Sequence, residues 1–331
     1  MAKTVYIFSN GELKRKGNTL CFEAEDGQTK YVPVGEVAEI MAFGELSFNK
    51  KCLEFLSQNE ILLHYFSHYG YYMGTFYPRE HLNAGLVILK QAEHYLDAGK
   101  RVELARGFVR GAQKNMLQVL RYYNRRGRLL DEPLQAIVDL GQQIEGCTAT
   151  DELMAVEGNI RNTYYAAFDT ITEDPVFKFE VRSRRPPQNH LNCLISFGNT
   201  FLYTVVLSEI YKTHLDPRIG YLHATNFRRF SLNLDVAEVF KPIIVDRAIF
   251  AVVGRRQLTE KEFEAGTEGI VLTEQGRKTF VAELEEKLQT TLRHQALGRN
   301  VSYRRLIRLE LYKLEKHILG ERTYEPFVAR W

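Results

Sequence analysis

The chain has 331 residues, of which 45% are hydrophobic and 26% are charged. This composition excludes a disordered or low-complexity protein, and the length favours two domains. Its apolar runs, such as residues 243–254, are interrupted by charge and are shorter than a membrane span. The first residues lack the apolar core of a signal peptide. We therefore expect a cytoplasmic protein with no membrane association.

Charge and cysteine content further limit the class of protein and the kinds of site that the chain could contain. The net charge is +3, yet residues 1–75 carry 7 Lys/Arg against 9 Asp/Glu, so the positive excess lies in the remainder. A nucleic-acid surface is therefore expected only beyond residue 75, although +3 is too small to establish one. The four cysteines (Cys21, Cys52, Cys147 and Cys193) form no CxxC pair. This favours reduced thiols over a zinc site or a disulfide framework.

Residues 1–78 have the pattern of a small β domain. The dipeptides Asn10-Gly11 and Asp26-Gly27 predict β-hairpin turns, and Pro78 is expected to close the domain. A helix is expected at residues 50–58, with Asn49 or Ser47 as its N-cap. Strands are expected at residues 3–9, 19–23, 29–34, 39–43, 61–65 and 71–76. The aromatic residues between 64 and 77 fit either a core or a subunit contact.

From residue 79 the apolar spacing becomes helical. Helices are expected at residues 81–98, 101–126, 133–145, 151–170, 274–294 and 301–320, and an apolar helix is expected after Pro186-Pro187. Residues 259–266 are charged and typical of a loop, and the aromatic tail, residues 324–331, is expected to dock. The chain is thus predicted to be an α+β protein, with a small N-terminal β-strand domain (residues 1–78) followed by a larger all-α domain (residues 79–331).

A run of cations marks the second of these helices. Residues 100–128 contain nine Lys/Arg and one acid, Glu103. The cations at helical spacing are Arg106, Arg110, Lys114, Arg121 and Arg125. A solvated helix face is one interpretation, but such faces usually alternate in sign to form i,i+4 pairs. The pattern favours a stripe that faces a polyanion.

The helix at residues 151–170 carries a mixed face. Glu157, Arg161, Tyr164 and Tyr165 share one side at i, i+4, i+7 and i+8. The plain interpretation is a surface ion pair beside a tyrosine packing face. Gly158 weakens a helix, which suggests that another group approaches it closely.

Residues 181–203 begin with a basic loop that contains Arg182, Arg184 and Arg185. The apolar helix that follows carries Asn192, Ser196 and Tyr203. His190 is interpreted as a loop or cap residue and not as a ligand.

Residues 220–247 contain the highest density of potential metal ligands and cationic side chains. His223, Asp235 and Glu238 are groups that a divalent metal accepts, and Arg228, Arg229 and Lys241 suit an anionic substrate. Asp235, Glu238 and Lys241 follow at intervals of three, and Pro242 should end or kink their helix. Taken alone, the segment is only suggestive, because a lone histidine in a mixed segment is more often structural than a ligand.

Three segments together resemble one family, the CRISPR-associated adaptation integrases (Cas1). The first is the Glu-Gly helix segment, and the second is an Arg-Pro loop with a downstream Asn and Leu-x-Ser-Phe. The third combines Gly-x-Leu-His, Arg-x-Ser-Leu, Asp-x-x-Glu-x-x-Lys-Pro and Asp-Arg. The matching residues are Glu157, Gly158, Arg161, Tyr164 and Tyr165; Arg185, Pro186, Asn192, Leu194, Ser196 and Phe197; and Gly220, Leu222, His223, Arg229, Ser231, Leu232, Asp235, Glu238, Lys241, Pro242, Asp246 and Arg247. Tyr221 and Phe230 depart from the commoner pattern without touching a candidate ligand.

The resemblance implies a role for each matched position. Glu157, His223 and Glu238 would bind a divalent ion, Mn²⁺ or Mg²⁺, and Asp235 would support the site or join it. Lys241 and Arg229 would neutralise phosphates. A set of oxygen and nitrogen ligands favours Mn²⁺ over Mg²⁺.

The resemblance also implies an activity and partners. The 3′-hydroxyl of a short DNA fragment would attack a phosphodiester at the edge of a CRISPR repeat, and double-stranded or branched DNA would lie along residues 100–128 and 182–185. A homodimer would form through the β domain, and the companion protein Cas2 would bridge two dimers. Two alternatives stay open: a stand-alone metal-dependent nuclease acting on branched DNA, and a non-catalytic DNA-binding scaffold.

Overall fold

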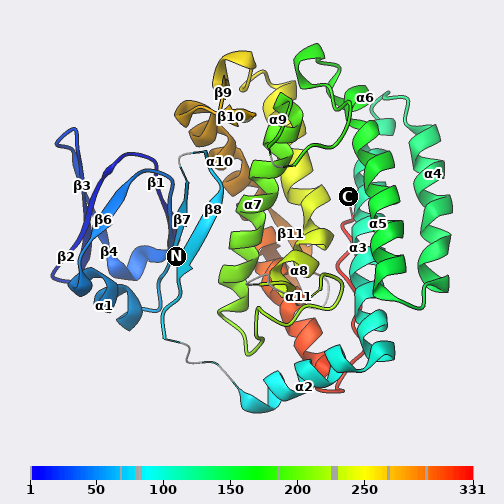
Figure 1. Ribbon diagram of the computed structural model, residues 1–331, viewed down its shortest axis with the longest axis horizontal. Coiled ribbons are helices and arrows are strands. Elements are labelled where there is room, and N and C mark those ends of the chain that lie inside the picture. Colours follow the sequence, from blue (N-terminus) through cyan, green and yellow to red (C-terminus); the bar gives the residue numbers. More distant parts are fainter. Residues whose placement is uncertain are drawn as a thin grey trace. The chain divides into compact units, whose positions relative to one another are not determined.

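The chain folds into two compact units, Met1–His81 and Leu82–Trp331. The computed structural model describes residues 2–67, 69–79, 82, 84–184, 186–224, 230–266, 269–294 and 297–330. Strands dominate the first unit and helices the second (Figure 1). The α+β class predicted from the sequence is therefore confirmed.

The first unit contains two four-stranded sheets. Their strand orders are β1-β5-β7-β8 and β4-β3-β2-β6, and each combines parallel and antiparallel pairs. The strands are β1 (Lys3–Ile7), β2 (Gly11–Lys16), β3 (Thr19–Ala24), β4 (Thr29–Pro33), β5 (Val37–Ala42), β6 (Leu46–Phe48), β7 (Leu62–Phe66) and β8 (Tyr72–Phe76), with a 3₁₀ turn at Val34–Glu36.

One apolar core holds this unit together. The helix α1 (Lys50–Gln58) begins as predicted, because the Asn49 side chain accepts a hydrogen bond from the Cys52 N–H at 3.1 Å. Its buried face, Cys52, Phe55 and Leu56, joins a core cluster with residues of both sheets, such as Ile40 of β5 and Leu13 of β2. This continuous core fixes the two sheets as one unit.

The predicted hairpin at Asn10-Gly11 is wrong, whereas the one at Asp26-Gly27 is confirmed. Strand β1 pairs with β5, and β2 starts a different sheet. Gly11 is required by a close approach, since a Cβ there would lie 2.3 Å from the Glu23 carbonyl oxygen. The Asn10 carboxamide accepts a hydrogen bond from the Glu45 N–H at 2.9 Å and so ties the connection between β1 and β2 to the residue just before β6.

The second unit is built around the helix α7 (His190–Ile210). Helix α8 packs on α7 and on α3, and α3 also packs on α4 and α5, which lie beside it in Figure 1. The helices are α2 (Gly85–Leu96), α3 (Ala98–Asn124), α4 (Asp131–Gln142), α5 (Thr150–Ala166), α6 (Phe168–Thr172), α7, α8 (Leu232–Lys241), α9 (Arg247–Gly254), α10 (Glu274–Gln289) and α11 (Tyr303–Ile318). Short 3₁₀ turns lie at Gln143–Gly146, Pro175–Phe177 and Glu260–Glu262, and a π-helical turn at Pro242–Asp246.

Helix α7 is long and apolar enough to cross a membrane. The apolar runs noted in the sequence were shorter than a membrane span, so a helix with this property was not expected. In the structure 83% of its apolar window is buried inside the unit. It is the central core helix, and its burial accounts for its composition. The four cysteines are all free and buried, as expected from their spacing.

Two small hairpins depart from the all-helical expectation for this unit. The charged segment after residue 259 contains β9 (Phe263–Ala265), which pairs with β10 (Ile270–Leu272). The helix expected to reach residue 294 ends at Gln289, and β11 (Thr291–His294) pairs with β12 (Arg299–Ser302).

The C-terminal tail docks on the helical unit, as its aromatic residues predicted. The Tyr324 hydroxyl donates a hydrogen bond to buried Glu310 at 2.7 Å, and the Phe327 ring stacks on Phe240 of α8 at 5.5 Å. Asn115 of α3 donates to the Phe327 carbonyl and accepts from the Ala329 N–H, both at 2.9 Å. The tail thereby braces α3 and α8.

Candidate active site

Two helices and one loop bring the candidate groups together. Helix α5 supplies Glu157, α8 supplies Asp235 and Glu238, and the segment before α8 supplies His223. An interval of three places Asp235, Glu238 and Lys241 on one side of α8. That side is buried, since these three residues are 0%, 4% and 5% exposed.

Asp235 anchors the loop that carries the histidine. Its Oδ2 accepts hydrogen bonds from the backbone N–H groups of Tyr221 at 2.5 Å and Leu222 at 3.0 Å. Its Oδ1 accepts from the His223 N–H at 2.9 Å and lies 2.7 Å from His223 Nδ1. These hydrogen bonds all go to the loop, which favours a supporting role for Asp235 over a ligand role.

This contact sets the state of the His223 ring. With Nδ1 donating to a carboxylate, Nε2 is the nitrogen left to act as a ligand, the usual arrangement of metal-binding histidines. Nε2 has no hydrogen-bond partner among the described residues. Burial lowers the pKa of His223, but the hydrogen bond and charge of Asp235, with the charge of Glu238, outweigh burial and raise it above its usual value.

Glu238 is held between two cations. Its Oε1 accepts from Lys241 Nζ and its Oε2 from Arg161 Nη2. Burial raises the pKa of Glu238, but the charges of Lys241 and Arg161 lower it more, so it is well below its usual range. The side chain is therefore an ionised carboxylate, the form that a metal or a cation requires.

Arg161 links the two candidate glutamates. Its Nε donates to Glu157 Oε1 at 3.0 Å, while Nη2 serves Glu238 on the other helix. The surface ion pair expected from the sequence is in fact enclosed, because the Arg161 and Glu157 side chains are 8% and 14% exposed. One guanidinium thus sets the distance between α5 and α8 at this point.

The chemical types of the candidate ligands suit a divalent ion. It combines an oriented imidazole with two carboxylates, which suit Mn²⁺ or Mg²⁺. Within the described ranges, no three His, Cys, Asp or Glu side chains lie close enough to hold a metal ion. Cations of the protein itself occupy both oxygens of Glu238 and one oxygen of Glu157, so a Glu238 oxygen has to be released before an ion can bind there.

Lys241 lies deeper than the role of phosphate contact implies. It is 5% exposed, bonds Glu238, and its Nζ is 4.9 Å from the centre of the Tyr203 ring. Burial lowers the pKa of Lys241, but the Glu238 charge raises it above its usual value. The lysine is a fixed positive charge inside the site.

Asn192 and Ser196 have a clear purpose, which the sequence did not reveal. Both hold Arg182: its Nη1 donates to Asn192 Oδ1 at 2.8 Å and its Nη2 to Ser196 Oγ at 3.1 Å. Burial lowers the pKa of Arg182, although nearby Tyr165 opposes this. Arg182 is therefore a further, half-buried cation of this region. The signal available in the sequence was its position between a basic loop and the motif asparagine.

The remaining predicted residues separate into buried and exposed groups. Tyr164 and Tyr165 are 0% and 3% exposed and pack edge-on against Phe168, which confirms the packing interpretation. A Cβ added at Gly158 would meet no described atom within 4 Å, so the expected close approach is wrong. Arg184 is exposed. Arg185, Arg228 and Arg229 lie outside the described residues.

The basic stripe on α3 divides into two halves. Arg106 donates to the carbonyls of Ile144 and Cys147 at 3.2 and 2.8 Å, and Arg110 donates to Glu145 at 3.0 Å. These arginines fasten α3 to the turn after α4. Lys114, Arg121 and Arg125 are exposed and form no ion pair with any described residue, so they are the part of the stripe that is open to a polyanion.

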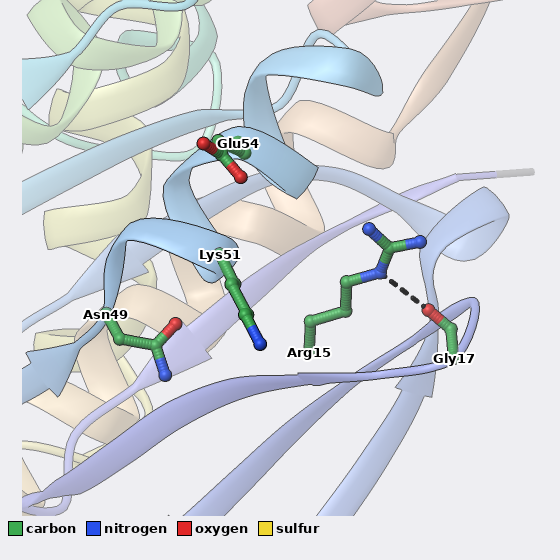
Figure 2. Close-up of a pocket in the computed structure, with 5 residues that line it drawn as sticks. All are labelled: Arg15, Gly17, Asn49, Lys51 and Glu54. Atoms are coloured by element: carbon green, nitrogen blue, oxygen red, sulfur yellow. Dashed lines mark hydrogen bonds between the residues drawn. The ribbon is translucent and has the colours of Figure 1, made fainter.

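A surface hollow of about 460 Å³ lies elsewhere, in the first unit (Figure 2). It is lined by exposed residues around the end of β2, Arg15 and Gly17, and at the N-cap and in the first half of α1, Asn49, Lys51 and Glu54. Arg15 donates to the Gly17 carbonyl at 3.0 Å. The hollow contains none of the candidate ligands, and the chemistry described above belongs to the second unit alone.

Comparison with known proteins identifies the family of this chain. Residues 5–286 match the family described as CRISPR associated protein Cas1. A CRISPR-associated endonuclease Cas1 of Thermodesulfovibrio yellowstonii is 57% identical over the whole of both chains. The solved structure of a Cas1 protein from Thermotoga maritima superposes with a TM-score of 0.89 at 49% identity, covering 98% of this chain and 99% of that one.

Two more distant structures share the fold alone. A casposase bound to an integration product has a TM-score of 0.87 at 19% identity, covering 98% of this chain and 93% of that chain. A Cas6-RT-Cas1–Cas2 complex contains a chain with a TM-score of 0.86 at 16% identity, covering all of this chain and 36% of that chain. The family match and the full-length relatives together establish that this chain belongs to the CRISPR-associated Cas1 family.

Proposed function

We propose that this chain is a divalent-metal-dependent DNA integrase of CRISPR adaptation. It joins the 3′-hydroxyl of a short DNA fragment to a phosphodiester at the edge of a CRISPR repeat. In this transesterification, one P–O bond forms at the fragment end while one P–O bond of the repeat breaks, and the displaced 3′-oxygen leaves with a proton. The endonuclease names of the full-length relatives support chemistry on a phosphodiester.

One observation carries the proposal. Two glutamates from different helices share Arg161, and the charge of one of them, Glu238, acts on a histidine that a buried aspartate fixes. Glu157, His223 and Glu238 would hold Mn²⁺ or Mg²⁺, which would stabilise the charge that develops on the phosphate and on the leaving oxygen. Asp235 holds the His223 ring so that Nε2 is its available nitrogen. Lys241 keeps Glu238 ionised and adds a positive charge near the phosphate.

The substrate and partners follow from surfaces of the chain. Exposed Lys114, Arg121, Arg125 and Arg184 supply cations for the phosphates of double-stranded or branched DNA. In the first unit, β8 is an edge strand, and Tyr65 and Met73 are 45% and 61% exposed, which suits a homodimer contact. Cas2 as a bridge between two dimers and a cytoplasmic location complete the proposal; the fold is shared with a chain of a Cas1–Cas2 complex.

An integration assay tests the reaction. The purified chain, with and without Cas2, is incubated with a labelled fragment that has free 3′-hydroxyls, a supercoiled plasmid bearing a CRISPR repeat, and Mn²⁺ or Mg²⁺. We expect the label to join the plasmid, and Glu157→Gln to abolish joining while fragment binding is retained. Glu286→Gln, at an exposed position of α10, is the matched control and should join normally.

The same assay separates the alternatives. Cleavage of branched DNA without any joined product, under all conditions, would identify a stand-alone nuclease. Activity that is identical in Glu157→Gln and in the parent chain would place the chemistry outside this chain and leave it a DNA-binding scaffold.

A further inference from the structure

A buried carboxylate without a partner lies next to the proposed metal site. The π-helical turn Pro242–Asp246 joins α8 to α9 and places Asp246 in the interior, where it is 0% exposed. Neither oxygen of its carboxylate has a hydrogen-bond partner among the residues that the structure describes. An isolated buried carboxylate is costly, and π-helical turns frequently mark functional positions. Burial raises the pKa of Asp246 to about 7, against the opposing charges of Arg161 and Lys241.

Arg161, whose charge interacts with Asp246, has a hydrogen-bond donor that is not used among the described residues. Arg161 uses Nε and Nη2 for Glu157 and Glu238, while its Nη1 is buried and unpaired within the described part of the chain. The Tyr164 hydroxyl lies close enough to Asp246 for each group to shift the pKa of the other, but it forms no hydrogen bond of ordinary geometry with any described residue. Arg161 and Asp246 interact through their charges but form no hydrogen bond. The interior thus contains the Asp246 carboxylate, which accepts no hydrogen bond, and the Arg161 Nη1 group, which donates none, among the described residues.

The present pairing of Arg161 conflicts with metal binding. Arg161 and Lys241 now hold both oxygens of Glu238, and Arg161 also holds one oxygen of Glu157. A divalent ion that takes Glu157 and Glu238 needs at least one of the Glu238 oxygens, and two cations in a weakly polar interior repel each other strongly. Arg161 cannot shed its charge, because its pKa is far above neutral. It therefore requires another anion within reach, and the unpaired Asp246 carboxylate meets that requirement.

We propose that Asp246 is a positioning residue that receives Arg161 when a divalent ion binds Glu157 and Glu238. Without the ion, Arg161 joins the two glutamates and keeps α5 and α8 together. With the ion, the guanidinium exchanges hydrogen bonds to the glutamates for hydrogen bonds to Asp246, and the glutamate oxygens become available as ligands. This inference rests on the metal site of the proposed function, and it explains why a costly unpaired carboxylate is retained in the core.

A double-mutant cycle on metal affinity tests the exchange. Mn²⁺ binding to the full chain is measured by titration calorimetry for the parent, Asp246→Asn, Arg161→Leu and the double variant. We expect Asp246→Asn to weaken Mn²⁺ binding at least about tenfold. In the Arg161→Leu background the same substitution should change the affinity by no more than about twofold, because no arginine needs to move.

Controls make each outcome decisive. Asp139→Asn, on the exposed side of α4, is the matched control and should bind Mn²⁺ like the parent. Thermal unfolding without metal checks that Asp246→Asn is folded; removal of an unpaired buried charge should leave its Tm equal or higher. An equal loss of affinity with and without Arg161 would show a simple field effect and overturn the exchange, as would parent-like affinity of Asp246→Asn. If the parent itself binds no Mn²⁺, the proposed metal site fails instead.

Discussion

Replacement of Asp235 by asparagine tests whether this residue holds the histidine loop. The carboxylate is fully buried, and it accepts three backbone N–H groups and the His223 ring. Asparagine is nearly the same size, yet it has one acceptor oxygen where aspartate has two. At least two of the four hydrogen bonds are therefore lost, and their donors then face an amide NH₂ group.

The expected loss of stability follows from those hydrogen bonds. A hydrogen bond to a charged group contributes about 1.5–3 kcal/mol, so Asp235→Asn should lower the free energy of unfolding by about 3 kcal/mol or more. In a unit of this size, that change lowers Tm by about 6–12 °C. His223→Ala removes only the ring contact and leaves the three backbone bonds, so it should cost about 1.5 kcal/mol.

Scanning calorimetry of the metal-free chain measures both variants beside the parent. Metal binding should weaken in both variants, because each removes either the imidazole or the group that orients it. The order of the two Tm values is the critical result. If Asp235→Asn unfolds at the same temperature as His223→Ala, or above it, the carboxylate does not anchor the loop and the assigned role is wrong.

Two further predictions concern DNA binding and packing. Changing Lys114, Arg121 and Arg125 together to alanine should weaken DNA binding and reduce the salt slope, log K against log [salt], by about 0.9 for each phosphate that is no longer neutralised. Arg106→Ala is the control, which should lower Tm and leave the slope unchanged. An unchanged slope in the triple variant would place DNA elsewhere. Glu209 is fully buried between two arginines of α11; burial raises its pKa, but the charges of Lys212 and those arginines lower it overall. Its contribution is therefore complete above the unfolded pKa and is lost as pH falls through the lower folded pKa, so Glu209→Gln should cost about 3 kcal/mol at pH 7. The gap in Tm between Glu209→Gln and the parent should narrow as pH falls below the unfolded pKa of about 4.3 and close only below the lower folded pKa, and a gap independent of pH would contradict the ionic origin.

Local signals predicted much of the fold, and their failures have physical causes. Helix α1 was predicted to the residue because Asn49 acts through a hydrogen bond only three residues away. Asn10-Gly11 misled because glycine serves two purposes, a turn or a close approach, and here the neighbour is Glu23 of another strand. The strand β9 is three residues long, too short for an alternating pattern to show within a charged segment.

The candidate site was predictable as a set of positions but not as a set of hydrogen bonds. Helical periodicity was enough to place Asp235, Glu238 and Lys241 on one side of α8. The donors to Asp235 are loop amides 12–14 residues away, and Arg161 meets Glu238 across 77 residues. No local sequence pattern shows which carboxylate oxygen already accepts a hydrogen bond from another part of the chain. The distinction between a ligand and a residue that orients a ligand therefore appears only in the folded chain.

The arginines of α3 show why charge alone does not reveal a surface. Arg106 has an ideal stripe position, but its fork of N–H groups satisfies two carbonyls at the end of a neighbouring turn. Arginine is suited to both tasks, since carbonyls and phosphates are acceptors of similar geometry. What separates the tasks is burial of the helix: α3 is enclosed by α4, α5 and α8, and its cations are free only at positions that face solvent, from Lys114 onward. A basic run on a core helix therefore predicts a nucleic-acid surface only after the packing of that helix is known.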